Sequence, residues 1–202
     1  MENNTINRRD AIKKTALLMG YAISASAIGG VMNGCKADPN ALAEGLENWT
    51  PIFLSKPEGQ LVAQITESIL PKTDTPGAID AGVYSFIDIY LKHNSNSGKQ
   101  AIFKNDLLSF ESSCEVETGK SFLDCNKEEK IAFLKKEEAL AIEKTELNPE
   151  EKTFWFSIKE LTFLGYFTSE IGSKQFLKYD PIPGNYEACI PLDEVGGTWY
   201  TL

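Results

Sequence analysis

The strongest constraint on the fold is a run of apolar and aromatic residues between 148 and 172, followed by a tail rich in Pro and Gly. Asn148 predicts a helix N-cap, Pro149 suits the first helical position, and Glu151 completes a capping-box pattern. Gly172 predicts the end of this helix. A helix that is apolar most of the way round is buried on most sides. We therefore expect the rest of the chain to pack around it.

The tail after about residue 173 cannot continue the helix, because prolines and glycines interrupt it. We expect an irregular, extended C-terminal arm. Such a segment either covers the protein's own core or lies in the groove of a partner, and the two roles are compatible.

Four further helices are predicted upstream. Ser55 predicts an N-cap for a helix that stops before Pro71, and Asp80 predicts the cap of a second helix. A third helix is expected at about 99–112, and Asn126 with Glu129 predicts a capping box that opens a fourth. Apolar residues recur at helical spacing in each, and period-two alternation appears only in short pieces of the tail. The sequence thus predicts an all-α fold, a bundle of about five helices, within a single domain at 57–202.

The N-terminus has the features of an export signal, so residues 1–34 are excluded from the fold. The segment from Asn7 to Lys13 resembles a twin-arginine motif, with Arg8 and Arg9 as its pair, and an apolar run follows at 16–31. A single membrane anchor is the alternative interpretation of that run.

Two processing sites compete after the signal. Met32 to Cys35 resembles a lipobox, which would place a lipid on Cys35, whereas 41–43 offers ordinary cleavage after Ala43. With lipidation, residues 35–56 become a polar tether and the protein is periplasmic and membrane-anchored without spanning the bilayer.

The formal charge of −9 disfavours nucleic acid, because nucleic-acid binding depends on neutralising phosphates. The sequence also contains no glycine-rich dinucleotide fingerprint, P-loop or haem-attachment motif, so we expect no cofactor in this chain. The twin-arginine route moves folded proteins. This chain is therefore either exported in the folded state without a partner, or it carries a cofactor-bearing partner out with it.

Candidate catalytic and metal-ligating residues are few. The single histidine, His93, lies at a predicted helix end, where a surface role is expected. Asp74, Asp80 and Asp88 flank a turn, and they are the only acidic residues whose position suggests a catalytic role. No catalytic or metal-binding residue is predicted.

Four cysteines in an exported chain indicate an oxidising compartment. Cys114 and Cys125 bracket a short connection and are the best candidates for a disulfide. Cys189 would then be buried in the tail, or pair with another chain or with one of these two.

Two blocks carry a resemblance to a known family. The first is ILPKTDTPGA at 69–78, followed by 81–83 and 86–88, and the second is GYFTSEIG at 165–172 with the tail to Pro191. Together with the twin-arginine start, they resemble the gluconate 2-dehydrogenase subunit 3 family. Ala188 departs from the glycine that is commoner before the cysteine.

This resemblance implies an accessory subunit of a periplasmic, membrane-associated sugar or polyol dehydrogenase. Its large subunit is a flavoprotein of the glucose–methanol–choline (GMC) type carrying FAD, and a cytochrome c with haem c often accepts the electrons. The leading hypothesis is a non-catalytic small subunit that supports export and maturation of that flavoprotein. The alternative is a stand-alone helical envelope lipoprotein with a binding or scaffolding role. On the first reading the residues expected at the partner interface are Tyr166, Phe167, Tyr179, Pro181, Pro183, Tyr186 and Cys189.

Overall fold

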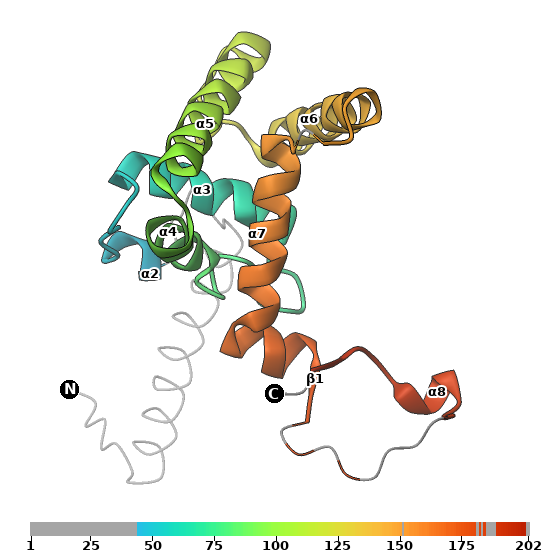
Figure 1. The fold of residues 1–202 in the computed structure, drawn as a ribbon. Helices are drawn as coiled ribbons and strands as arrows, with labels where there is room; N and C mark the ends of the chain where they lie inside the picture. Colours follow the sequence, from blue (N-terminus) through green and yellow to red (C-terminus); the bar gives the residue numbers. More distant parts are fainter. Residues whose placement is uncertain (1–43, 151, 181, 183, 185–188, 201–202) are drawn as a thin grey trace, which may run out of the picture. The chain divides into compact units, whose positions relative to one another are not determined.

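Helix α7 (Phe154–Thr168) is the element around which the others pack, and it contacts α3, α4, α5 and α6 (Figure 1). The computed structural model describes residues 44–202 apart from 151, 181, 183, 185–188 and 201–202. In these residues, five helices of 12 to 22 residues carry the fold. The predicted all-α class is confirmed. The helices are α3 (Lys56–Ile69), α4 (Val83–Asn94), α5 (Ser97–Thr118), α6 (Lys127–Leu147) and α7.

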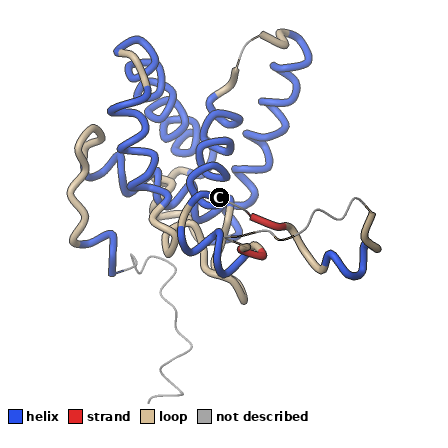
Figure 2. Tube along the Cα trace, turned by 60° about the horizontal axis from the view of Figure 1, so that its bottom comes forward, coloured by secondary structure: helices blue, strands red, loops and turns tan. Residues whose placement is uncertain are grey.

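Shorter elements flank the five helices. One turn of helix, α2 (Glu44–Glu47), precedes α3, and a π-helical turn, η1 (Gly172–Phe176), follows α7. In the C-terminal arm, β1 (Lys178–Tyr179) pairs in parallel with β2 (Trp199–Tyr200), and α8 (Leu192–Val195) lies between them in the chain (Figure 2). The described residues belong to one compact unit, 42–202.

Two helix starts follow from short-range chemistry. The Ser55 hydroxyl accepts from the backbone of Glu58, whose carboxylate accepts from the Ser55 backbone in return, and Asn126 and Glu129 form the same box. Both predicted caps are confirmed. Each box satisfies backbone donors that a helix start leaves without partners.

The predicted start of α7 is wrong. Asn148 ends α6, where its backbone N–H donates to the Lys144 carbonyl. Pro149 disfavours helical geometry in the residue before it, and this ends α6 at Leu147. Helix α7 begins five residues later, after Thr153, whose side chain makes no cap hydrogen bond.

The predicted end of α7 is also wrong. The helix stops at Thr168, and Gly172 opens the π-helical turn instead. A Cβ on Gly172 would lie 1.9 Å from the Tyr166 carbonyl oxygen, so glycine is required here for close backbone approach.

Asp80 does not cap the second helix. Helix α4 starts at Val83 after Gly82, which adopts the left-handed φ of 69°. Asp80 lies in the preceding turn, where its carboxylate accepts from the Gly77 N–H.

The core is rich in aromatic rings where α5, α6 and α7 meet. Phe110 packs edge-on against Phe122 and Phe133, with ring centroids 5.3 and 5.1 Å apart. Phe122 and Phe133 are almost completely buried, and burying each such ring contributes about 2–3 kcal/mol. Three apolar residues of α5 and α6, Ile102, Ile131 and Leu140, are exposed.

The segment before α3 is fixed to the helices by a buried acid. Asp88 of α4 is 1 % exposed, and its carboxylate accepts from the backbone N–H groups of Ile52, Phe53 and Leu54 at 2.6, 3.1 and 2.7 Å. Trp49 packs edge-on against Tyr84 nearby. The end of the predicted tether therefore packs on the helical domain, although Ile52 is exposed.

No helix in the described part of the chain has the length and hydrophobicity needed to cross a bilayer.

Candidate partner interface

The two sequence blocks that carry the family resemblance meet in space. Tyr166 of α7 donates a hydrogen bond from its hydroxyl to the Pro76 carbonyl at 2.7 Å. One residue earlier, a Cβ on Gly165 would lie 2.7 Å from the Phe86 ring, so glycine lets α4 and α7 approach closely. Residues of both blocks therefore belong to one structural unit.

The turn between α3 and α4 is organised by Glu67. Its carboxylate accepts from the backbone N–H groups of Lys72 at 2.9 Å and Ile79 at 2.8 Å. A Cβ on Gly77 would lie 2.7 Å from the Lys72 backbone nitrogen and 2.3 Å from a Glu67 carboxylate oxygen, so glycine is favoured at that point of the turn. Burial raises the pKa of Glu67, while the two backbone donors and Lys72 act to lower it.

The three acids that flank this turn have no arrangement suited to acid–base catalysis. Asp88 anchors the backbone of 52–54, and Asp80 forms an ion pair with Lys72 at 3.0 Å. Asp74 is exposed on the turn. His93 is exposed in the last turn of α4, as predicted.

Helix α7 carries an apolar face that the rest of the described chain leaves open. We call it the α7 aromatic face and define it by Phe156, Phe163, Leu164, Phe167 and, from η1, Phe176. Phe163 is 39 % exposed, Leu164 43 % and Phe176 51 %. The expectation that α7 is buried on most sides is therefore wrong for this face.

Ring contacts give the α7 aromatic face a fixed shape. Phe163 stacks on Phe167 with ring centroids 6.2 Å apart, and Phe167 lies 5.5 Å from Phe176. Lys159 and Glu160 stand at its edge. Contiguous exposed apolar side chains of this kind mark interaction sites in soluble proteins.

The predicted interface residues have different positions. Phe167 is half-buried within the α7 aromatic face, whereas Tyr166 is buried, at 2 % exposure. The Tyr166 hydroxyl donates to the Pro76 carbonyl within the fold, and the expected contact of this residue with a partner stays a prediction.

The remaining expected residues lie on the C-terminal arm or outside the description. Tyr179 is half-buried in β1, and Cys189 is an exposed free cysteine. Pro181, Pro183 and Tyr186 lie outside the described residues, as do Arg8, Arg9 and Cys35 of the export segment.

Sequence reasoning missed Phe156, Phe163, Leu164 and Phe176 as surface residues, and it missed the role of Glu67. A usable signal for the first group was present. Six aromatic residues fall within the 15 residues of α7, so that apolar rings lie all round the helix rather than on one stripe.

The predicted disulfide between Cys114 and Cys125 is absent from this structure. Both are buried free cysteines, and their sulfur atoms lie 3.9 Å apart, well beyond the bonded distance of about 2.05 Å.

The described residues form no group of three or more His, Cys, Asp or Glu side chains that could hold a metal ion. A groove of about 290 Å³ lies between α4, α5 and α7, lined by residues that include Tyr90, Asp106 and Ser157. Burial raises the pKa of Asp106 there, while Lys144 lowers it. These residues do not form a nucleophile–base pair.

The family model for gluconate 2-dehydrogenase subunit 3 matches residues 56–184 of this chain. The chain belongs to the gluconate 2-dehydrogenase subunit 3 family. No curated protein and no solved structure matches the chain.

Membership of the gluconate 2-dehydrogenase subunit 3 family implies a subunit of a dehydrogenase complex. The match begins at the first residue of α3 and contains the Tyr166–Pro76 contact. The α7 aromatic face also lies entirely within the matched residues, so the most exposed apolar surface of α7 belongs to the part that is common to the family.

Proposed function

We propose that this chain is the non-catalytic small subunit of a membrane-associated, flavin-dependent sugar or polyol dehydrogenase, and that it binds the large GMC-type flavoprotein subunit. The observation that carries the proposal is the α7 aromatic face, which lies within the family match and has no partner among the described residues. Exposed Phe163, Leu164 and Phe176 lose contact with water when a second protein covers them. Each square ångström of apolar surface so buried contributes about 25 cal/mol before the costs of association.

The chemistry of the complex belongs to other subunits. FAD in the large subunit would accept the hydride from the sugar, and haem c in a third subunit would accept electrons from the flavin. The described part of this chain offers neither a glycine-rich loop between a strand and a helix nor a metal-ligand cluster. We therefore place the substrate pocket in the partner, and the partner sets which sugar or polyol is oxidised.

The N-terminal segment supplies export in this proposal. Arg8 and Arg9 direct the folded chain to the twin-arginine route, and the flavoprotein travels bound to it with its FAD already loaded. Lipidation of Cys35 then holds the complex at the membrane on the periplasmic side.

Co-expression with the large subunit tests this function. We compare the native chain with a variant in which Arg8 and Arg9 are both changed to Lys, and with Lys14→Arg as a charge-preserving control outside the arginine pair. Flavin content and dye-linked dehydrogenase activity are measured in the periplasmic and membrane fractions. Both should fall to background in the double variant and remain normal in the control.

Normal exported activity in the double variant would contradict the carrier role. Purification of this chain as a monomer, with no flavoprotein attached under any extraction condition, would contradict the subunit role. That second result would favour a stand-alone helical envelope lipoprotein instead.

A further inference from the structure

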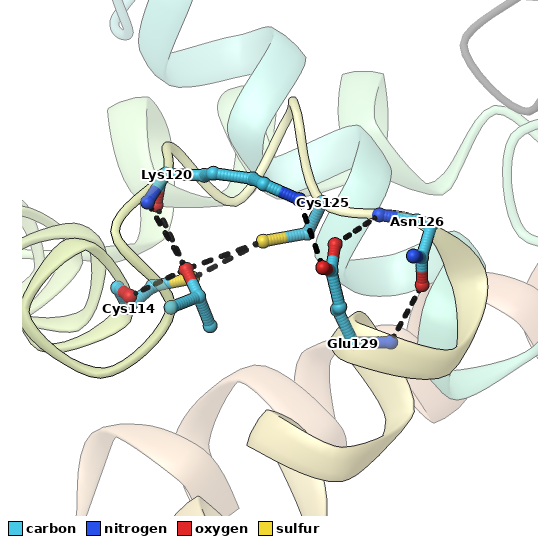
Figure 3. A network of polar contacts seen from close by, with 6 residues as sticks. Cys114, Lys120, Cys125, Asn126 and Glu129 are labelled. Atoms are coloured by element: carbon cyan, nitrogen blue, oxygen red, sulfur yellow. Dashed lines mark hydrogen bonds and ion pairs between the residues drawn. The ribbon is translucent and has the colours of Figure 1, made fainter.

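Two buried thiols face one another at the junction of α5 and α6. Cys114 lies near the C-terminal end of α5, and Cys125 immediately precedes Asn126, the N-cap of α6. Cys114 is fully buried and Cys125 is 2 % exposed. Their sulfur atoms lie 3.9 Å apart. Figure 3 shows the two sulfur atoms directed toward each other.

Hydrogen bonds hold the connection between the two cysteines in place. Thr118 donates from its hydroxyl to the Cys114 carbonyl at 2.8 Å, and the same hydroxyl accepts from the Lys120 N–H at 3.2 Å. The Cys125 thiol donates to the Thr118 hydroxyl at 3.5 Å. The Cys114 sulfur lies 3.8 Å from the same hydroxyl, so both sulfur atoms contact the Thr118 side chain.

The two ends of the connection are fixed as well. Gly119 ends α5 in the left-handed conformation, with φ of 73°. Glu111 of α5 accepts from the Ser121 hydroxyl at 2.6 Å, while Lys120 pairs with Glu129 of the α6 capping box at 2.8 Å. The connection therefore presents Cys125 to Cys114 in a fixed position, and Cys189, the other described cysteine, is exposed on the C-terminal arm.

We propose that Cys114 and Cys125 are an oxidation site, at which a disulfide forms after folding and joins the end of α5 to the start of α6. The oxidant is a disulfide of the thioredoxin-like or glutathione class. The thiolate of Cys125 attacks that disulfide, forms a mixed disulfide and releases one thiol. The thiolate of Cys114 then attacks the Cys125 sulfur and releases the second thiol, so each cysteine loses one proton and the oxidant gains two electrons.

The order of attack follows from burial. Cys125 lies at the end of a short connection, which can open locally, whereas Cys114 lies within a helix. Burial raises the pKa of the Cys114 thiol to about 12, so this thiol reacts last. It attacks when the connection closes again and returns the mixed disulfide on Cys125 to the side of Cys114. Oxidation should therefore be slow in the native state and faster at low, non-denaturing concentrations of urea, which favour opening.

The test uses the full-length chain, reduced, freed of reductant and incubated with oxidised glutathione as the oxidant. Peptide mapping without reductant should recover one peptide pair that links Cys114 to Cys125, lighter by two hydrogen atoms than the free peptides. Oxidation closes a loop of roughly a dozen residues, so the unfolding equilibrium constant should fall by about a hundredfold relative to the reduced chain. Cys189→Ser should behave as the native chain does, whereas Cys125→Ser should show neither the link nor the change.

Recovery of Cys114 and Cys125 as alkylated free thiols after prolonged oxidation would overturn the proposal. So would a link from either residue to a different cysteine, or a Cys114–Cys125 link that leaves the unfolding equilibrium unchanged. The mapping is made on the native chain, so the result stands even if a substituted chain folds poorly.

Discussion

The Tyr166 hydroxyl donates to the Pro76 carbonyl at 2.7 Å, across 90 residues of sequence. This contact joins α7 to the turn that Glu67 organises between α3 and α4. It also fixes the rotation of α7 about its own axis, because a buried tyrosine must direct its hydroxyl to an acceptor. With Tyr166 turned inward, Phe163 and Phe167 are held toward the α7 aromatic face.

Tyr166→Phe removes that hydrogen bond and leaves the Pro76 carbonyl without this donor. We expect the free energy of unfolding to fall by about 1–2 kcal/mol. Urea denaturation of the purified chain measures it. Tyr90→Phe, at a half-buried tyrosine of α4 outside this contact, is the matched control and should change stability by less than about 0.5 kcal/mol. Equal losses in both variants would contradict the role assigned to Tyr166.

Gly172→Ala places a methyl group 1.9 Å from the Tyr166 carbonyl oxygen. The π-helical turn must shift to relieve this overlap, so we expect a loss of about 2–3 kcal/mol and a change in the environment of Phe176. Thermal unfolding and near-ultraviolet circular dichroism measure the two effects. Gly98→Ala is the control, because its Cβ would meet only the Asn96 side chain at 3.4 Å within the first turn of α5. That variant should be neutral or slightly stabilising, since alanine favours a helix over glycine.

Asp88→Ala removes the acceptor for three backbone N–H groups at 52–54. Hydrogen bonds to a charged acceptor contribute about 1.5–3 kcal/mol each, so we expect a loss of at least about 3 kcal/mol. Amide hydrogen exchange should accelerate at 52–54 more than in α6. Asp74→Ala, on the exposed part of the turn, should leave both stability and exchange unchanged. Unchanged exchange at 52–54 in Asp88→Ala would show that apolar packing alone holds this segment.

Glu67 gives the stability of the turn a dependence on pH. Burial raises its pKa, so the folded chain binds this proton more tightly than the unfolded chain does. The free energy of unfolding should therefore fall as pH rises from the ordinary glutamate pKa through the raised folded value. Glu67→Gln cannot release a proton, and its unfolding free energy should decline less steeply over the same window. Urea denaturation at a series of pH values measures both slopes, with the exposed Glu146→Gln as control, and parallel curves for Glu67→Gln and the native chain would contradict this account.

Short-range chemistry made part of the fold predictable. The N-cap at Ser55 and the capping box at Asn126 form as predicted, and Glu58 completes a box at Ser55 as well. Asn148 has the same pattern and fails, because α6 extends to Leu147 and Asn148 caps the end of that helix instead. A local pattern therefore predicts an N-cap only where the residue does not already end a neighbouring, longer helix.

The orientation of α7 was not predictable from sequence. Its apolar residues surround the helix, so periodicity alone does not indicate which side the neighbouring helices cover. Tyr166 and Phe167 illustrate the difficulty, since one turns into the core and the next lies on the α7 aromatic face. The choice depends on a contact with Pro76 that local sequence rules do not describe.

The most direct test of the proposed function is the binding of the flavoprotein to the α7 aromatic face. The full-length chain, tagged and co-expressed with the large subunit, is purified as the native form, as Phe163→Asp and as Val116→Asp. Val116 is the control, because it is an apolar residue of α5 that is 89 % exposed and lies outside the α7 aromatic face. Circular dichroism of each chain alone checks that the helices are retained.

We expect FAD to co-purify with the native chain and with Val116→Asp in equal amounts. With Phe163→Asp the bound FAD should fall at least tenfold, because an unpaired charge buried in an apolar interface costs several kcal/mol. Retention of the native amount of FAD by a folded Phe163→Asp chain would contradict the claim that this face binds the flavoprotein.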